Sequence, residues 1–343
     1  MQEAAVVAYG RRALADMPGC AIVVGPHGRI VYANDAARTV MGMGDYVGRS
    51  FADFFSDHAN EANDDFYEMF LSAVYDKSAR QQGRCAFVAP DGTRYVFFVT
   101  SSHLVYEDEG YFVMTCADVT AEEEAERLRR ESIIVLVSAI VYICLFIFVY
   151  SVWNYLGQPF EPQGMTVILE VGGVLLGLFV FKMTSLTFED LGLGTKNLAH
   201  NLKVDGIACL GIIAFFMVLK LVLMKVAPGI LDHPETFYDP SWVTPVRFLS
   251  YIPTALIQEF LTRGIMQESL CHVFMSKYRE SMAIIISTLM FATLHLSYTP
   301  FYMLGAGLLL LVFGIIYKRQ RSIWGLALIH FTFGMTAAML GII

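Results

Sequence analysis

Residues 121–154 read AEEEAERLRRESIIVLVSAIVYICLFIFVYSVWN, and this stretch divides the chain into two parts. Eight of its first eleven residues are charged, whereas the following 23 carry no charge. Because about 20 consecutive apolar residues cross a hydrocarbon core of about 30 Å, the second part predicts a membrane-spanning helix. The charged part, residues 121–131, predicts a connecting helix. Two chemically different halves should therefore lie on either side of it.

The composition of the two halves agrees with this division. Of the 343 residues, 16% are charged and 56% apolar, whereas an ordinary soluble domain has about 25% charged residues. Residues 1–131 contain 33 charged side chains and residues 132–343 only 23, although the second part is longer. A soluble globular fold for the whole chain is thereby excluded. The first half is acidic and has no basic patch, which argues against nucleic acid as a partner.

The cysteines and the first residues indicate the compartment. No CxxC spacing occurs, so neither a disulfide framework nor a zinc knuckle is predicted, and a reducing compartment fits the first half. The first 19 residues also lack the apolar run of a signal peptide. We therefore expect the N-terminal half to stay in the cytosol. The six cysteines are Cys20, Cys85, Cys116, Cys144, Cys209 and Cys271.

The first half predicts an α+β domain built on a sheet. Two β-branched runs at residues 20–24 and 29–32 flank a glycine-containing turn and predict a hairpin. Asn34 and Asp35 then offer a helix N-cap ahead of an alanine-containing stretch. After a helical middle, three further strands are predicted at residues 83–88, 95–100 and 110–116.

This order of elements resembles the PAS domain over about residues 14–120. Three short runs contribute to the resemblance: GRIVYAN, VGRS and DVT, at residues 28–34, 47–50 and 118–120. The resemblance implies a signal-sensing or dimerising module, whose ligand would lie between sheet and helices. No flavin-adduct cysteine motif is visible, and we expect His58 to be solvated rather than a haem ligand. The cofactor is therefore unknown, and a PAS domain without ligand stays an open alternative.

The connector at residues 121–131 allows two interpretations. It is either a solvated link or a signalling helix that pairs across a homodimer, and it has too few apolar positions for a coiled coil. The expected organisation is a PAS-like cytosolic domain at residues 1–120, this connector, and a membrane domain at residues 132–343.

The second half predicts an all-α multi-pass membrane domain of about seven transmembrane helices. Lysine and arginine gather at alternate ends of the apolar stretches, which predicts a cytosolic N-terminus and a C-terminus outside the cell membrane. Glu170 lies within the second stretch, and we expect it to snorkel to the outer face rather than to act in function. The seven stretches are residues 132–154, 165–181, 204–224, 244–273, 281–298, 300–317 and 322–342.

Ionisable residues inside a membrane are costly, so they are candidates for function. Glu259 and Arg263 are four residues apart on one helical face and should form an ion pair. At about 1.5 Å per residue, Gln258, His295 and His330 reach comparable depths from the cytosolic ends of their helices. Two imidazoles, an amide and a carboxylate can then face one polar cavity.

Three runs on three of these helices, QEFLTRG, FATLH and HFTFG, resemble the motifs EExxxR, FxxxH and HxxxN of the CPBP family. This family comprises CAAX prenyl proteases and bacteriocin-processing or self-immunity membrane proteins, and the match covers about residues 244–343. The resemblance implies an intramembrane endopeptidase in which the first glutamate and the histidines activate a water. The asparagine, with a histidine, would stabilise the oxyanion.

Two positions depart from these motifs. Gln258 replaces the first glutamate, and loss of a general base typically costs about 10²- to 10⁴-fold in rate. Gly334 replaces the asparagine, and loss of an oxyanion donor costs about 10²- to 10³-fold more. The ordinary mechanism survives only if Glu259 takes over as the base and releases Arg263.

Two hypotheses of different classes follow. The first is a PAS-regulated intramembrane endopeptidase that cleaves a membrane-associated peptide or protein substrate. The second is a catalytically degenerate relay or binding protein that keeps the fold and the cavity; a transporter fits the motifs less well. A metal site is disfavoured because two histidines lack a third ligand, and Glu268 and His272 are expected to be interfacial. The candidate catalytic residues are Gln258, Glu259, Arg263, His295 and His330.

Overall fold

A computed structural model describes residue 8 and residues 12–75, 82–106, 108–231, 234–238, 243–297 and 300–342. The chain forms two compact units, Met1–Glu126 and Arg127–Ile343. The division falls inside the charged segment that the sequence marks as a connector.

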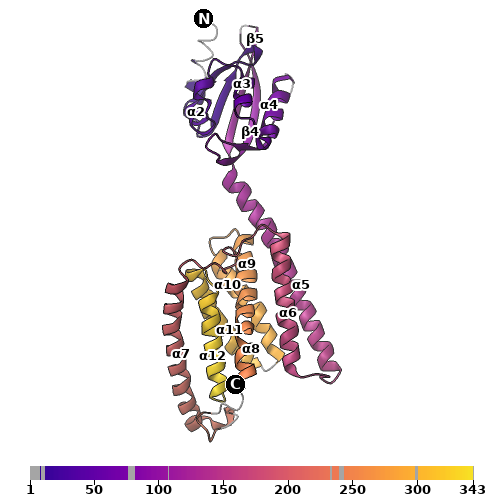
Figure 1. Ribbon diagram of the computed structural model, residues 1–343, viewed down its shortest axis with the longest axis vertical. Helices are drawn as coiled ribbons and strands as arrows, with labels where there is room; N and C mark the ends of the chain where they lie inside the picture. Colours follow the sequence, from indigo (N-terminus) through magenta and orange to yellow (C-terminus); the bar gives the residue numbers. More distant parts are fainter. Residues whose placement is uncertain are drawn as a thin grey trace. The chain divides into compact units, whose positions relative to one another are not determined.

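The first unit is built on a five-stranded antiparallel sheet with the strand order β2-β1-β5-β4-β3 (Figure 1). The predicted hairpin, the helical middle and the three later strands are confirmed, although the fourth strand runs six residues further than predicted. The strands are β1 Cys20–Val24, β2 Ile30–Ala33, β3 Gln82–Val88, β4 Arg94–Tyr106 and β5 Glu109–Asp118. The 3₁₀ turn η1 Pro26–Gly28 joins β1 to β2. The helices between β2 and β3 are α2 Asp35–Val40, α3 Phe51–Asp57 and α4 Asp64–Tyr75, with the short 3₁₀ turns η2 Met43–Tyr46 and η3 Glu61–Asn63.

Asn34 joins the sheet to the first helix. As predicted, it caps α2, because its side-chain oxygen accepts a hydrogen bond from the Ala37 amide at 2.9 Å. The same oxygen accepts from the amide of Ala21 on β1, and the side-chain nitrogen donates to the Gly19 carbonyl at 2.9 Å. The side chain is buried, so these bonds satisfy polar groups that water does not reach.

The second unit is entirely helical. Its helices are α5 Thr120–Tyr155, α6 Pro162–Met183, α7 Leu198–Val226, α8 Pro245–Glu259, α9 Glu268–Val273, α10 Arg279–Ala292, α11 Pro300–Gln320 and α12 Trp324–Met339. A π-helix, η6 Phe260–Gln267, joins α8 to α9, and the 3₁₀ turns η4 Pro228–Ile230 and η7 Thr293–Ser297 follow α7 and α10. The helix α5 runs without a break from Thr120 to Tyr155, so the predicted charged helix continues into the first apolar stretch. Its first residues, up to Glu126, belong to the first unit.

Four helices among the described residues are long and apolar enough to cross a membrane, which fits a multi-pass membrane protein. They are Thr120–Tyr155, Gly164–Met183, Leu198–Val226 and Met303–Gln320. The other three predicted spans are also helical. However, α10 and α12 are only 14 and 16 residues long, and the run from α8 to α9 contains Glu259, Arg263 and Glu268.

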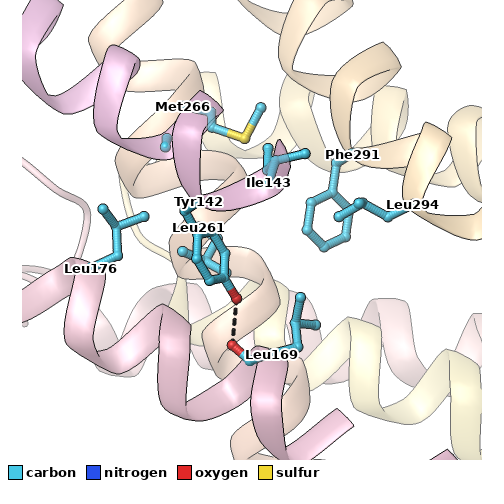
Figure 2. A pocket seen from close by; sticks show the side chains of 9 residues that line it. Tyr142, Ile143, Leu169, Leu176, Leu261, Met266, Phe291 and Leu294 are labelled. Carbon is cyan, nitrogen blue, oxygen red and sulfur yellow. Dashed lines mark hydrogen bonds between the residues drawn. The ribbon is translucent and has the colours of Figure 1, made fainter. Parts of the chain in front are cut away.

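Apolar side chains point outward along the long helices and inward into buried clusters, two of which are large. Leu145, Leu178 and Leu210 are each more than half exposed, as expected for a lipid-facing surface. One cluster joins α5 and α6 to η6, and the other joins α7, α10, α11 and α12. Figure 2 shows the contact between α5 and α6, where the hydroxyl of Tyr142 on α5 donates a hydrogen bond to the carbonyl of Leu169 on α6 at 2.5 Å. The cavity beside it measures about 10 Å³, room for about one water.

Candidate functional site

The candidate site begins where α8 changes into the π-helix η6. Gln258 and Glu259 are the last residues of α8, and Arg263 lies inside η6. A π-helical turn inserts one residue into the hydrogen-bond ladder and frequently marks a functional site. Gly264 is needed in this turn because the Leu191 carbonyl oxygen lies where a Cβ would be. The backbone of the loop between α6 and α7, which contains Leu191, therefore packs directly against the π-helix that carries Arg263.

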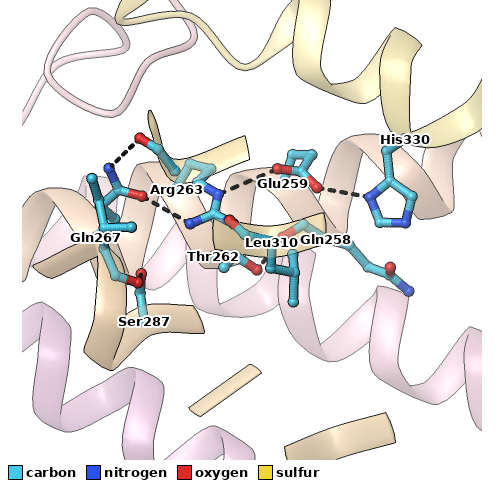
Figure 3. Close-up of polar contacts among 10 residues, drawn as sticks. Gln258, Glu259, Thr262, Arg263, Gln267, Ser287, Leu310 and His330 are labelled. Carbon is cyan, nitrogen blue, oxygen red and sulfur yellow. Dashed lines mark hydrogen bonds and ion pairs between the residues drawn. The ribbon is translucent and has the colours of Figure 1, made fainter. Parts of the chain in front are cut away.

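Glu259 lies between two partners. One carboxylate oxygen is 2.7 Å from Nδ1 of His330 on α12, and the other is 3.5 Å from Nε of Arg263 (Figure 3). The side chains of Glu259 and Arg263 are 0% exposed, and that of His330 is 11% exposed. The predicted ion pair is confirmed, and it is fully excluded from solvent.

Arg263 is held by two further contacts besides Glu259. Its guanidinium donates to Oε1 of Gln267 at 2.8 Å and to the Leu310 carbonyl on α11 at 2.6 Å. Gln267 in turn donates to the Gly314 carbonyl one helical turn further along α11. These bonds fix the cation against backbone carbonyls, so it cannot leave Glu259 without breaking buried hydrogen bonds.

His330, which contacts Glu259, also lines a cavity of about 380 Å³. Gln258, His295 and His330 contribute polar groups to its wall, and most other wall residues are apolar. A second cavity of about 240 Å³ shares Gln258, Phe291 and His295 with the first. The residues lining the first cavity are Phe216, Tyr251, Gln258, Phe291, His295, Gly305, Ala306, Leu309, Leu310, His330, Phe333, Gly334, Ala337 and Ile342.

The structure therefore separates the five candidate residues into two groups. Gln258, His295 and His330 line one cavity, as the depth estimate predicts. Glu259 and Arg263 are not among the lining residues and lie buried behind His330. The ordinary mechanism requires Glu259 to release Arg263 and act as the base, and this arrangement does not meet that condition, because the carboxylate contacts both His330 and Arg263.

Two residues of the site were not identified from the sequence. Gln267 holds Arg263, and its position four residues later on the same helix is the signal that could have found it. Tyr251 lines the cavity seven residues before Gln258, a spacing that returns to the same helical face. Neither residue type suggests membrane function on its own.

Two acidic residues of the membrane domain have partners that the sequence did not predict. Glu170 accepts a hydrogen bond from the Thr254 hydroxyl on α8, so a neighbouring helix and not the interface satisfies it. Glu268 is buried and forms ion pairs with Arg321 and with His272, the latter at 3.4 Å. Arg321 lies 53 residues later, in the loop between α11 and α12, so the sequence predicted an interfacial carboxylate and not a buried ion pair.

The PAS unit contains its own cavity, of about 540 Å³. It lies between the sheet and the helices and is lined by residues that include His27, Tyr67, His103 and Tyr111. His58 is not among them. Its side chain is partly exposed, its ring packs against Tyr46 and Phe54, and its Nδ1 lies 2.9 Å from the Phe54 carbonyl.

The cysteines of the PAS unit are core side chains. Cys20, Cys85 and Cys116 are buried and free. Desolvation, with a smaller effect of nearby aspartates, raises the pKa of Cys20 and of Cys85 to about 11, and burial also raises the pKa of Cys116 well above its usual range. These thiols stay protonated at neutral pH.

Among the described residues, no group of three or more histidine, cysteine, aspartate or glutamate side chains can hold a metal ion.

Comparison with known protein families agrees with both parts of the chain. Residues 240–336 match the family model described as type II CAAX prenyl endopeptidase Rce1-like, and residues 18–121 match the PAS domain. The resemblance to CAAX proteases and to PAS domains is thereby confirmed. No curated protein matches the chain.

Solved structures of PAS and light-oxygen-voltage proteins are similar to about a third of this chain. The PAS domain of an HTR-like protein from Haloarcula marismortui is 16% identical over 34% of this chain and 99% of that one, with a TM-score of 0.25. An RNA-binding light-oxygen-voltage receptor is 18% identical over 36% of this chain, with a TM-score of 0.28. This chain spans only 35% of that receptor's length.

Proposed function

We propose that this chain, in which a PAS domain precedes an Rce1-like CAAX protease domain, is a PAS-regulated intramembrane endopeptidase. It hydrolyses a peptide bond of a membrane-associated substrate by an activated water. The observation that carries the proposal is the 2.7 Å contact between Glu259 and His330 at the wall of a cavity that Gln258 and His295 also line.

In this mechanism His330 is the general base. An ionised carboxylate only accepts hydrogen bonds, so Nδ1 of His330 carries the proton that Glu259 accepts, and Nε2 is left with a lone pair. Nε2 takes a proton from water as the water oxygen attacks the peptide carbonyl. The imidazolium then returns the proton to the leaving amine as the C–N bond breaks. Glu259 does not touch substrate and is a positioning residue, as is the third member of a hydrolytic triad.

The other polar residues have supporting tasks. Arg263 is the buried ion-pair partner of Glu259, at 3.5 Å, and so balances the charge of a carboxylate that water does not reach. His295 and Gln258 face the same cavity and can donate hydrogen bonds to the substrate carbonyl. Figure 3 shows the amide of Gln258 on the side of the site where His330 lies, away from Gln267. The hydrolytic chemistry thus rests on a buried ion pair behind a histidine at the cavity wall.

We expect Gln258→Glu to raise the rate of peptide cleavage by about 10²-fold, because it adds a second base to the cavity wall. The measurement is cleavage of a membrane-anchored fluorogenic peptide by the purified full-length protein in lipid nanodiscs. Gln158→Glu, which changes an amide that lines only the second cavity, is the matched control and should leave the rate unchanged.

The same experiment tests the second candidate function, a catalytically degenerate relay. The neutral Gln258 at the cavity wall is the observation that favours it. If the wild type is inert, and Gln258→Glu gains an activity that His295→Ala removes, the relay is correct and the endopeptidase is not. Wild-type cleavage that disappears in Glu259→Gln supports the endopeptidase.

The PAS domain is proposed to regulate this activity through α5, which starts at Thr120 and continues into the membrane unit. The arrangement proposed for the membrane is seven helical passes with a cytosolic N-terminus, an external C-terminus and a homodimer formed by the PAS domain and the connector. The cavity of about 540 Å³ supports a small-molecule signal.

Removing residues 1–118 should change the cleavage rate by about 5- to 150-fold, the usual range of coupling between two sites. Ala52→Trp places a large side chain at the PAS cavity but keeps the domain. If both variants change the rate, the cavity binds the signal; if only the deletion does, the domain regulates by protein contacts. An unchanged rate in both variants contradicts regulation.

A further inference from the structure

Position 334 has no side chain, and another residue fills the space where one would begin. A Cβ built on Gly334 would be nearest to the hydroxyl oxygen of Tyr251, and 2.7 Å from two ring carbons of the same tyrosine. These distances are far shorter than any real Cβ contact. Tyr251 on α8 and Gly334 on α12 are therefore complementary, because the glycine makes room for the phenol.

The hydroxyl of Tyr251 lies in the neighbourhood of the proposed chemistry. Its ring centroid is 6.1 Å from that of His330, at an interplanar angle of 79°. Gly334 follows His330 by one helical turn on α12. Tyr251, Gln258, His295, His330 and Gly334 all line the same cavity of about 380 Å³.

Attack of water on a peptide carbonyl creates a negative charge on the carbonyl oxygen. Hydrogen-bond donors aimed at that oxygen are usually the largest single contribution to such catalysis, and a phenol can be one. Because most of the cavity wall is apolar, one donated hydrogen bond has a larger effect there than in water.

We propose that the hydroxyl of Tyr251 supplies the oxyanion donor that Gly334 lacks, and donates a hydrogen bond to the anionic oxygen formed beside His330. This inference rests on the proposed endopeptidase function. No covalent bond to Tyr251 forms and its proton is not transferred. The asparagine of the HxxxN motif would be a donor at position 334 on α12. Here position 334 is a glycine, and the proposed donor is Tyr251 on α8.

The first test measures binding of a phosphinic peptide, whose tetrahedral anion has the shape and charge of the adduct. In the full-length protein in nanodiscs, Tyr251→Phe should weaken binding by about 10- to 100-fold, the effect of one hydrogen bond to a charged group. The matched control is Tyr142→Phe, which removes another membrane-domain hydroxyl, one that lines only the small cavity between α5 and α6. It should leave the affinity unchanged.

The second test moves the donor back to α12. Tyr251→Ala combined with Gly334→Asn should restore most of the affinity lost in Tyr251→Ala, whereas Tyr251→Ala with Gly334→Leu should not. Gly334→Asn alone should weaken binding, since Tyr251 occupies the space of its Cβ. Restoration by asparagine and not by leucine cannot come from a packing role.

The outcomes separate this inference from the proposed function. Peptide cleavage by the wild type with equal phosphinic peptide affinity in Tyr251→Phe overturns the role of Tyr251 and leaves the endopeptidase intact. Absence of cleavage, with an affinity that depends on Tyr251, overturns the endopeptidase and supports the hydroxyl as an anion donor. No measurable binding to the wild type overturns the inference.

Discussion

Glu259→Gln lowers kcat for peptide cleavage by about 10³- to 10⁴-fold and leaves KM nearly unchanged, if Glu259 sets the tautomer of His330. The amide has the size of the carboxylate but presents a donor on one side, so it can hold the imidazole in the wrong tautomer. Glu259 does not line the cavity, and its replacement should therefore not disturb substrate binding. The rate and KM are measured with the membrane-anchored fluorogenic peptide.

A double variant tests whether the two residues act as one unit. Glu259→Gln combined with His330→Ala should be no slower than His330→Ala alone, because residues that act as a unit have strongly non-additive effects. Multiplicative losses would mean that Glu259 acts by a separate route. An effect of Glu259→Gln on KM alone would contradict the positioning role.

Arg263→Met is expected to destabilise the membrane unit by about 3–5 kcal/mol, because it leaves the carboxylate of Glu259 buried without its ion-pair partner. Both side chains are fully buried, and the guanidinium also donates to Gln267 and to the Leu310 carbonyl. The measurement is thermal unfolding of the purified protein in detergent, with the loss of helical signal as the readout.

Two controls define this expectation. Adding Glu259→Gln to Arg263→Met should recover most of the lost stability, because no uncompensated charge is then buried. Lys318→Met removes an exposed ion pair between Lys318 on α11 and Glu280 on α10, 2.6 Å apart, and should cost less than about 1 kcal/mol. Equal losses for Arg263→Met and Lys318→Met would contradict a structural role for the buried pair.

Local patterns were enough to predict most of the PAS fold. The β-branched run at residues 20–24 and the cap at Asn34 depend on neighbours in the sequence, and both are confirmed. The charged helix that enters the first apolar stretch is confirmed for the same reason. The three motif runs also indicated which helices share a cavity, because membrane helices of similar length bring residues of similar depth together.

The arrangement within the site depended on contacts that the sequence does not contain. Whether Glu259 faces water or His330 is set by the packing of α12 against α8 and by the π-helical turn after Glu259. The proposal for Tyr251 depends on its fit against Gly334, and no local pattern could indicate this contact because the two residues are 83 positions apart. Thr254 and Arg321 could not be recognised as partners of Glu170 and Glu268, since Thr254 lies on another helix and Arg321 lies in the loop between α11 and α12.

The activation of water by His330 is tested most directly by hydrolysis of a membrane-anchored peptide in H₂¹⁸O by the wild type and by His330→Ala, followed by mass spectrometry. We predict two fragments from the wild type, with heavy oxygen in the new carboxyl terminus, and at least about 10²-fold less product from the variant. An intact peptide with the wild type, or equal product from both proteins, would contradict the proposal that His330, oriented by Glu259, activates the water.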